Sequence, residues 1–167
     1  MWVAASEMSV SDEARIHLEL EMPGIEAWAA RHGWKATIDL DQLTVRAEAP
    51  HPNATNTSVQ FIGEFSNYRQ HPPTWKCLVI EGGSPSSAFP AAGVISNGPP
   101  SSIFHGSKII CAPWSAGAYA EKGGPHGDWI SLNNWLSVLP PHSQAHTIAD
   151  MLSAFELHLS ASPGLIQ

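Results

Sequence analysis

The sequence predicts an α+β fold, because helical patterns lie near both ends of the chain and strand patterns lie between them. Three observations carry this prediction: an apolar repeat of helical spacing near the N-terminus, alternating apolar residues from Trp34 onward, and a second helical stripe near the C-terminus. Strand patterns that follow one another without intervening helices favour an antiparallel sheet over a doubly wound one. A chain of 167 residues is the usual size of one domain, so we expect a single domain over residues 1–167.

The first helix is predicted over Ser11–Met22. Ser11 is a candidate N-cap, and the two acidic residues after it suit the positive end of a helix. The apolar residues at positions 16 to 22 also alternate with period two, so a strand is the alternative here. We expect Pro23–Gly24 to break or end this helix, and a second short helix to follow over Ile25–His32.

The sheet is predicted from three runs of strand-like residues, which would form three or four strands. Trp34–Ala49 alternates along its length and predicts one long strand or two strands in a hairpin. The next strands are predicted over Ser58–Phe65 and Lys76–Glu81, and the proline-bearing segment Asn67–Trp75 joins them. Gly82–Pro100 is rich in Gly, Pro, Ser and Ala, so an irregular connection is expected there.

The C-terminal half alternates between irregular segments and helices. Ile103–Cys111 is expected to be extended, Ala112–Asp128 to be a loop, and Trp129–Leu139 to be a short helix. The clearest helix is predicted over His146–Leu159, where apolar residues form one stripe. Pro163–Gly164 is expected to end it.

Composition excludes several classes of protein. The formal net charge of −7, with only eight Lys and Arg, argues against a nucleic-acid backbone or an anionic membrane as the main partner. The N-terminus lacks the basic start and apolar core of a signal peptide, and no apolar run approaches the roughly 20 residues of a membrane span. We therefore expect a cytoplasmic protein that binds neither nucleic acid nor membrane.

Cys111 is the most informative residue of the chain. The β-branched pair Ile109–Ile110 favours an extended conformation, and Pro113 cannot continue a ladder or a helix. Cys111 is therefore expected where a strand-like segment ends and a surface loop begins, with its thiol open to a large partner. Cys77 lies within an apolar strand run and is expected in the core. The two could form a disulfide, but nothing in the sequence indicates an oxidising compartment.

Several of these signatures together resemble the ubiquitin-conjugating enzyme (E2) family, especially its divergent bacterial relatives. Phe61–Cys77 is similar to the family's strand, its Tyr- and Pro-Pro-bearing turn and its next strand, and Ile109–Cys111 is similar to its Ile-Cys active site. Thr147–Leu152 and Ser162–Gly164 match the helix after the active site and the closing Pro turn.

This resemblance implies a UBC-like fold with an N-terminal helix, a sheet of about four antiparallel strands, an irregular active-site segment and C-terminal helices. It implies that Cys111 accepts the C-terminal glycine of a ubiquitin-like protein or a cGAS-like nucleotidyltransferase as a thioester and transfers it to an amine. The expected partner is an E1-like activating enzyme, in an anti-phage operon of the CBASS or Bil type. No cofactor is expected.

The chain departs from the family pattern around the cysteine. His105 precedes Cys111 by six residues and is followed by glycine, whereas the family has His-Pro-Asn about ten residues upstream. The literal His51–Pro52–Asn53 lies before the Pro-Pro signature and is interpreted as unrelated, so the asparagine that stabilises the oxyanion has no counterpart. The first helix is acidic, whereas eukaryotic members carry a basic one.

Two histidines are candidate catalytic residues beside Cys111. His126 lies in a glycine-rich loop, where it could donate a hydrogen bond to the oxyanion or deprotonate the incoming amine near neutral pH; an exposed loop histidine is the alternative. His105 is expected to order the turn before Cys111 through a hydrogen bond to the backbone, with a catalytic role as its alternative.

Other functions remain open from the sequence. A non-catalytic binding module of the same fold needs no cysteine chemistry, and a hydrolase using Cys111 and His126 would differ only in taking water as the acceptor. A zinc enzyme is a further alternative, because His105, His142 and His146 add nitrogen ligands to these two residues. No metalloprotease, Cys-x-x-Cys or deaminase signature accompanies them.

Overall fold

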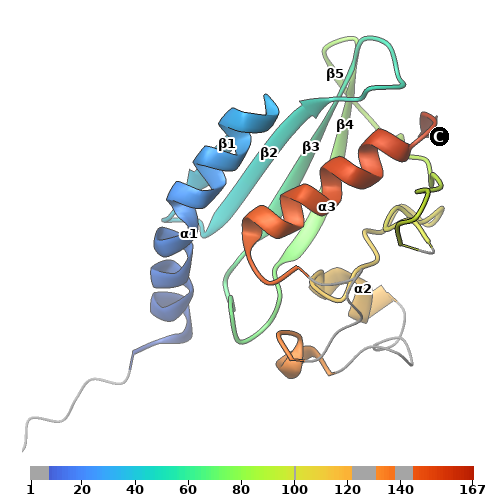
Figure 1. Cartoon of the computed structure of the whole chain (residues 1–167). Coiled ribbons are helices and arrows are strands. Elements are labelled where there is room, and N and C mark those ends of the chain that lie inside the picture. Colours follow the sequence, from blue (N-terminus) through green and yellow to red (C-terminus); the bar gives the residue numbers. More distant parts are fainter. Residues whose placement is uncertain (1–7, 100, 122–130, 138–144) are drawn as a thin grey trace, which may run out of the picture.

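The computed structural model describes residues 8–99, 101–121, 131–137 and 145–167 (Figure 1). Along the chain the elements are α1 (Val10–His32), β1 (Lys35–Asp39), β2 (Thr44–Pro50), β3 (Thr57–Glu64), β4 (Thr74–Glu81), β5 (Ser84–Ser86), β6 (Phe89–Pro90), α2 (Ala116–Glu121), the 3-10 helix η1 (Leu132–Asn134), α3 (Ile148–Ala161) and β7 (Leu165–Ile166). The predicted α+β class with an N-terminal helix, an antiparallel sheet and a C-terminal helix is confirmed.

The main sheet has five strands in chain order, β1-β2-β3-β4-β5, and every neighbouring pair is antiparallel. The predicted Trp34–Ala49 unit is thus two strands in a hairpin, with Ile38 opposite Val45. The short strand β5 makes the sheet one strand larger than expected. A separate two-stranded sheet pairs β6 with β7, so the C-terminal segment lies against residues 89–90.

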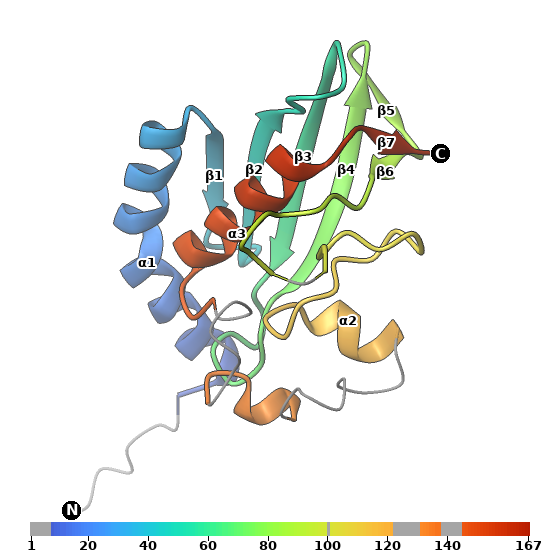
Figure 2. The ribbon, with the colours of Figure 1, turned by 45° about the vertical axis from the view of Figure 1, so that its right-hand side comes forward.

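Helix α3 crosses one face of the main sheet, and α1 lies at the β1 end of it (Figures 1 and 2). The two helices are joined by a hydrogen bond from Trp28 Nε1 to Ser153 Oγ at 2.8 Å. At the centre of the core, the Phe155 ring of α3 stacks on Phe61 of β3 at 4.0 Å between centroids and meets Trp75 of β4 edge-on at 5.0 Å. The apolar stripe predicted for this helix is therefore the surface that covers the sheet.

Helix α1 continues through Pro23, so the predicted break there is wrong. A proline inside a helix removes one hydrogen bond and costs about 3 kcal/mol. Leu18 before it and Ile25 after it are both completely buried, so packing on either side of the proline holds the two halves in one helix. The N-cap is Ser9 rather than Ser11: its side chain accepts from the Asp12 amide at 3.2 Å.

Two segments expected to be irregular contain regular structure. Gly82–Pro100 includes β5 and β6, and Ala112–Asp128 includes α2. The helix predicted over Trp129–Leu139 falls partly outside the described residues, and its described part contains η1. Within the described ranges, no helix combines the length and the apolar character that crossing a membrane requires.

Candidate functional site

Cys111 ends a short hairpin rather than a single extended segment. Phe104 and Ile110 form an antiparallel bridge, the Cys111 amide donates to the Ile103 carbonyl at 2.8 Å, and the His105 amide donates to the Ile109 carbonyl at 3.1 Å. The prediction that residues 103–111 are simply extended is therefore wrong. The chain turns back between these two arms and brings Cys111 beside Ile103.

His105 lies at the turn of this hairpin. Its carbonyl accepts from the Lys108 amide at 2.9 Å, and Lys108 has a φ of 62°, in the left-handed region that tight turns use. The main chain of His105 thus orders the turn before Cys111; a role for its side chain remains a prediction. His126, the second candidate, lies outside the described residues.

Cys111 is buried, with 8% of the residue exposed, and the expectation of an open thiol is wrong for this structure. The cause is the sequence around it: Ile110, Ala112 and Trp114 are all nearly fully buried and draw this segment against the core. The Tyr119 hydroxyl of α2 donates to the Pro113 carbonyl at 2.9 Å and holds the helix over the same segment. Ile110, Cys111 and Ala112 are all buried, and Cys111 is the most exposed of the three.

Cys77, expected in the core, is only partly buried. It lies on β4 opposite Phe61 of β3, packs against the apolar core, and forms no disulfide with Cys111. Burial raises the pKa of the Cys77 thiol to about 12. Its thiolate is therefore scarce at neutral pH, and Cys77 is a poor nucleophile.

A cavity of about 410 Å³ lies beside the Cys111 hairpin. Its walls are Thr74–Cys77 of β4, residues 108–110 of the hairpin, Phe89, and the small residues Gly117 and Ala120 of α2. Ile110, the residue before Cys111, forms part of this wall. The hairpin that ends at Cys111 therefore borders the same cavity as the outer edge of β4.

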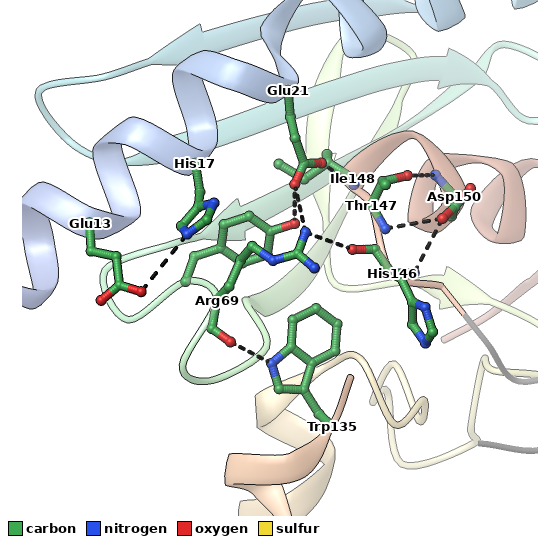
Figure 3. A network of polar contacts seen from close by, with 10 residues as sticks. Glu13, His17, Glu21, Arg69, Trp135, His146, Thr147, Ile148 and Asp150 are labelled. Atoms are coloured by element: carbon green, nitrogen blue, oxygen red, sulfur yellow. Dashed lines mark hydrogen bonds and ion pairs between the residues drawn. The ribbon is translucent and has the colours of Figure 1, made fainter. Parts of the chain in front are cut away.

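A polar cluster that the sequence did not indicate joins α1, the β3–β4 loop and α3 (Figure 3). Glu21 of α1 is its centre: one carboxylate oxygen accepts from the Tyr68 hydroxyl at 2.5 Å, and the other accepts from the Ile148 amide at 2.6 Å. The Arg69 guanidinium lies 3.6 Å from the same carboxylate. Burial and the nearby Glu21 charge raise the pKa of the Tyr68 hydroxyl, so it stays a donor over the physiological range.

The same cluster fixes the start of α3. Thr147 and Asp150 form a capping box, in which Thr147 Oγ accepts from the Asp150 amide at 3.1 Å and the Asp150 carboxylate accepts from the Thr147 amide at 3.0 Å. Arg69 donates to the His146 carbonyl at 3.3 Å, and Trp135 Nε1 donates to the Arg69 carbonyl at 3.0 Å. With two carboxylates at the N-terminal end of α3, the cluster also complements the helix dipole.

The His51–Pro52–Asn53 triplet holds the C-terminal end of α3. Asn53 Nδ2 donates to the Ser162 carbonyl at 2.8 Å, and His51 Nε2 lies 3.3 Å from Ser162 Oγ. Burial lowers the pKa of the His51 imidazole. These contacts give the triplet a structural role.

Among residues 8–99, 101–121, 131–137 and 145–167, no three His, Cys, Asp or Glu side chains gather closely enough to hold a metal ion. His126 and His142 of the zinc alternative lie outside these ranges. Comparison of the chain with protein-family models, with curated proteins and with solved structures finds no match.

Proposed function

We propose that this protein is an E2-like conjugating enzyme whose nucleophile is Cys111. The Cys111 thiolate attacks the C-terminal glycyl thioester carried by an E1-like enzyme, and the E1 thiolate leaves. An amine then attacks the new thioester, an amide bond forms, and the Cys111 thiolate is released. The proton lost by the amine passes to a base, the role assigned to His126. The carried group is the C-terminus of a ubiquitin-like protein or a cGAS-like nucleotidyltransferase.

The order of elements supports a UBC-like fold. A long helix is followed by an antiparallel meander, then by an irregular segment with the cysteine, and then by a helix across the sheet. The sequence signatures occur in the same order as in the family: the Tyr68 and Pro72–Pro73 turn before β4, Ile110–Cys111 after the sheet, and Pro163–Gly164 after α3.

The observation that carries the proposal is the difference between the two thiols. Cys77 packs against the contiguous apolar core, and burial raises its pKa to about 12. Cys111 instead ends a hairpin outside the main sheet, directly after residues 108–110, which form part of the wall of the cavity of about 410 Å³.

The 8% exposure of Cys111 favours a second function, a non-catalytic binding module of the same fold. Conjugation requires the hairpin or α2 to shift far enough for a partner's extended tail to reach the Cys111 sulfur. A binding module requires no such movement. The two functions therefore differ in whether the Cys111 thiol is reactive in the folded protein.

Alkylation of the folded protein separates these functions without any partner. In Cys77→Ala, Cys111 is the remaining thiol, and in Cys111→Ser only Cys77 remains. Iodoacetamide labelling followed by intact mass is expected to be about tenfold faster in Cys77→Ala than in Cys111→Ser, because the raised pKa of the Cys77 thiol leaves little thiolate at neutral pH. Labelling of Cys111 that occurs only on unfolding would favour the binding module.

Thioester formation tests the reaction itself. The protein is incubated with ATP, an E1-like enzyme encoded beside its gene and that enzyme's substrate, and the products are separated with and without reductant. The expected adduct is cleaved by reductant, is retained in Cys77→Ala, and becomes reductant-resistant or disappears in Cys111→Ser. Absence of an adduct on the intact protein would refute conjugation.

His126→Ala is expected to slow amine transfer more than thioester formation, and an equal loss in both steps would contradict the role of His126.

A further inference from the structure

Among the described residues, the outer edge of β4, on the side away from β3, has hydrogen-bonded neighbours at its two ends. At one end β5 pairs with residues 79–81. At the other end the first residue of α2, Ala116, donates its amide hydrogen to the Pro73 carbonyl at 2.9 Å. Between these contacts, the stretch Thr74–Leu78 has no neighbouring strand among the described residues.

The main-chain groups of Trp75 and Cys77 point to this uncovered edge. Successive residues of an antiparallel strand direct their N–H and C=O groups to opposite neighbours. The Gly82 amide donates to the Asn56 carbonyl at 3.0 Å, and this bond extends the β3–β4 ladder. The main-chain groups of the even-numbered residues of β4 therefore point toward β3. The odd-numbered Trp75 and Cys77 therefore present two N–H and two C=O groups outward, and these groups have no partner in the described part of the chain.

Trp75 and Cys77, which carry these four groups, both line the cavity of about 410 Å³ beside the hairpin. Trp75 is only 4% exposed, and buried main-chain groups are almost always hydrogen-bonded in proteins. The facing wall is made by α2 with its small residues Gly117 and Ala120, and a Cβ added at Gly117 would lie in van der Waals contact with Thr74 Cγ2 at 3.8 Å. A short extended chain bound along this edge would supply the missing partners.

The cavity is bordered by positive charge. Lys76 and Lys108 both line it, in a chain whose net charge is −7. Lys76 Nζ is paired with Glu64 at 3.2 Å, whereas Lys108 Nζ donates to the Ser87 carbonyl at 2.6 Å and has no carboxylate within 4.0 Å among the described residues. A carboxylate on a bound chain would gain a charge-assisted contact with Lys108.

We propose that this edge binds an extended, acidic segment of another protein as an additional strand. The segment lies in the cavity, pairs with the main chain of Trp75 and Cys77, and places a carboxylate near Lys108. Binding of this segment does not depend on the Cys111 thiol. Its measurement in Cys111→Ser therefore separates this inference from the conjugation reaction.

Amide hydrogen exchange in Cys111→Ser tests the edge. In the protein alone, the Trp75 and Cys77 amides are expected to exchange at least about tenfold faster than those of Lys76 and Leu78, which bond to β3. Addition of the probe acetyl-Val-Glu-Val-Glu-Val-amide is expected to protect the Trp75 and Cys77 amides. Equal protection of all four amides before the probe is added would overturn the inference.

Two changes to the probe test strand pairing and charge separately. Methylation of its central amide nitrogen removes a main-chain donor and is expected to abolish the protection. Replacement of its glutamates by lysine is expected to weaken binding. Protection that is unchanged by both alterations, or no protection at the highest soluble probe concentration, would refute an acidic strand as the occupant.

Variants of the protein complete the test. Lys108→Glu is expected to weaken probe binding by about three- to tenfold, and Lys35→Glu, the same charge change on β1, by less than about twofold. If Lys108→Glu does not fold, Lys76→Glu is measured in its place. Equal effects at Lys108 and Lys35 would refute the placement of the carboxylate. Concentration-dependent dimerisation through this edge would overturn the proposal in favour of a second copy of the chain.

Discussion

Replacement of Glu21 by alanine is expected to destabilise the protein by about 3–4 kcal/mol. The substitution leaves the Tyr68 hydroxyl and the Ile148 amide without their acceptor and Arg69 without its counter-ion. Hydrogen bonds to a charged group contribute about 1.5–3 kcal/mol each, and removing one member of a buried pair costs about 3–5 kcal/mol. The Glu21 side chain is 15% exposed, so water can reach part of the gap, which places the expected loss at the low end.

Urea unfolding followed by tryptophan fluorescence measures this loss in the free energy of unfolding. An unchanged m-value would show that the surface exposed on unfolding is the same in the variant. For a chain of this length the loss corresponds to a decrease in Tm of about 10 °C. Glu26→Ala on the same helix is the control: Glu26 is exposed and should lose less than about 0.5 kcal/mol. A loss below about 1 kcal/mol in Glu21→Ala would refute the reasoning that this carboxylate joins three elements.

Three further predictions concern packing, capping and titration. Gly63→Ala should cost about 1–3 kcal/mol, because the added Cβ would lie 2.6 Å from Phe65 Cε2 and 2.9 Å from Trp75 Cζ3. Thr147→Ala should cost about 1 kcal/mol by removing the cap of α3, as measured by urea unfolding. Burial lowers the pKa of the His158 imidazole from 6.5 to about 4, so its contribution to stability is complete above pH 6.5 and is lost as the pH falls towards 4. A series of urea midpoints against pH measures that decline.

Each of these predictions has a matched comparison. Gly24→Ala adds the same methyl group where no atom lies within 4 Å, so it should be neutral or stabilising, and an equal loss at both glycines would exclude the steric cause. Thr147→Ser keeps the capping oxygen and should retain most of the stability. His158→Gln should flatten the decline between pH 6.5 and pH 4; an unchanged slope would assign the titration to another group, such as the buried His51.

The sequence predicted the elements whose signals are local. The apolar stripe of α3 and the alternation over Trp34–Ala49 are periodic patterns, and both elements formed as expected. The break predicted at Pro23 is wrong, because burial of Leu18 and Ile25 on either side outweighs the local cost of the proline. Helix α2 was missed since its small residues carry neither a cap nor an apolar stripe.

The candidate site depended on contacts that no local pattern contains. The sequence indicated Cys111 from the β-branched residues before it and Pro113 after it, but its burial depends on how its apolar neighbours, the hairpin and Tyr119 pack in the folded protein. Glu21 was not singled out, because Tyr68 and Ile148 lie 47 and 127 residues away along the chain. The uncovered edge of β4 likewise follows from where β5 and α2 end, which strand propensity does not specify.

The position of α3 late in the chain has a consequence for biosynthesis. The meander joins strands that are neighbours in sequence, so it can form on the ribosome while α3 is still being translated. Until Phe155 is released from the exit tunnel, the aromatic face formed by Phe61 and Trp75 lacks the ring that packs closest to Phe61. Nascent chains stalled before α3 should therefore require chaperone protection, and this requirement should end once the helix docks.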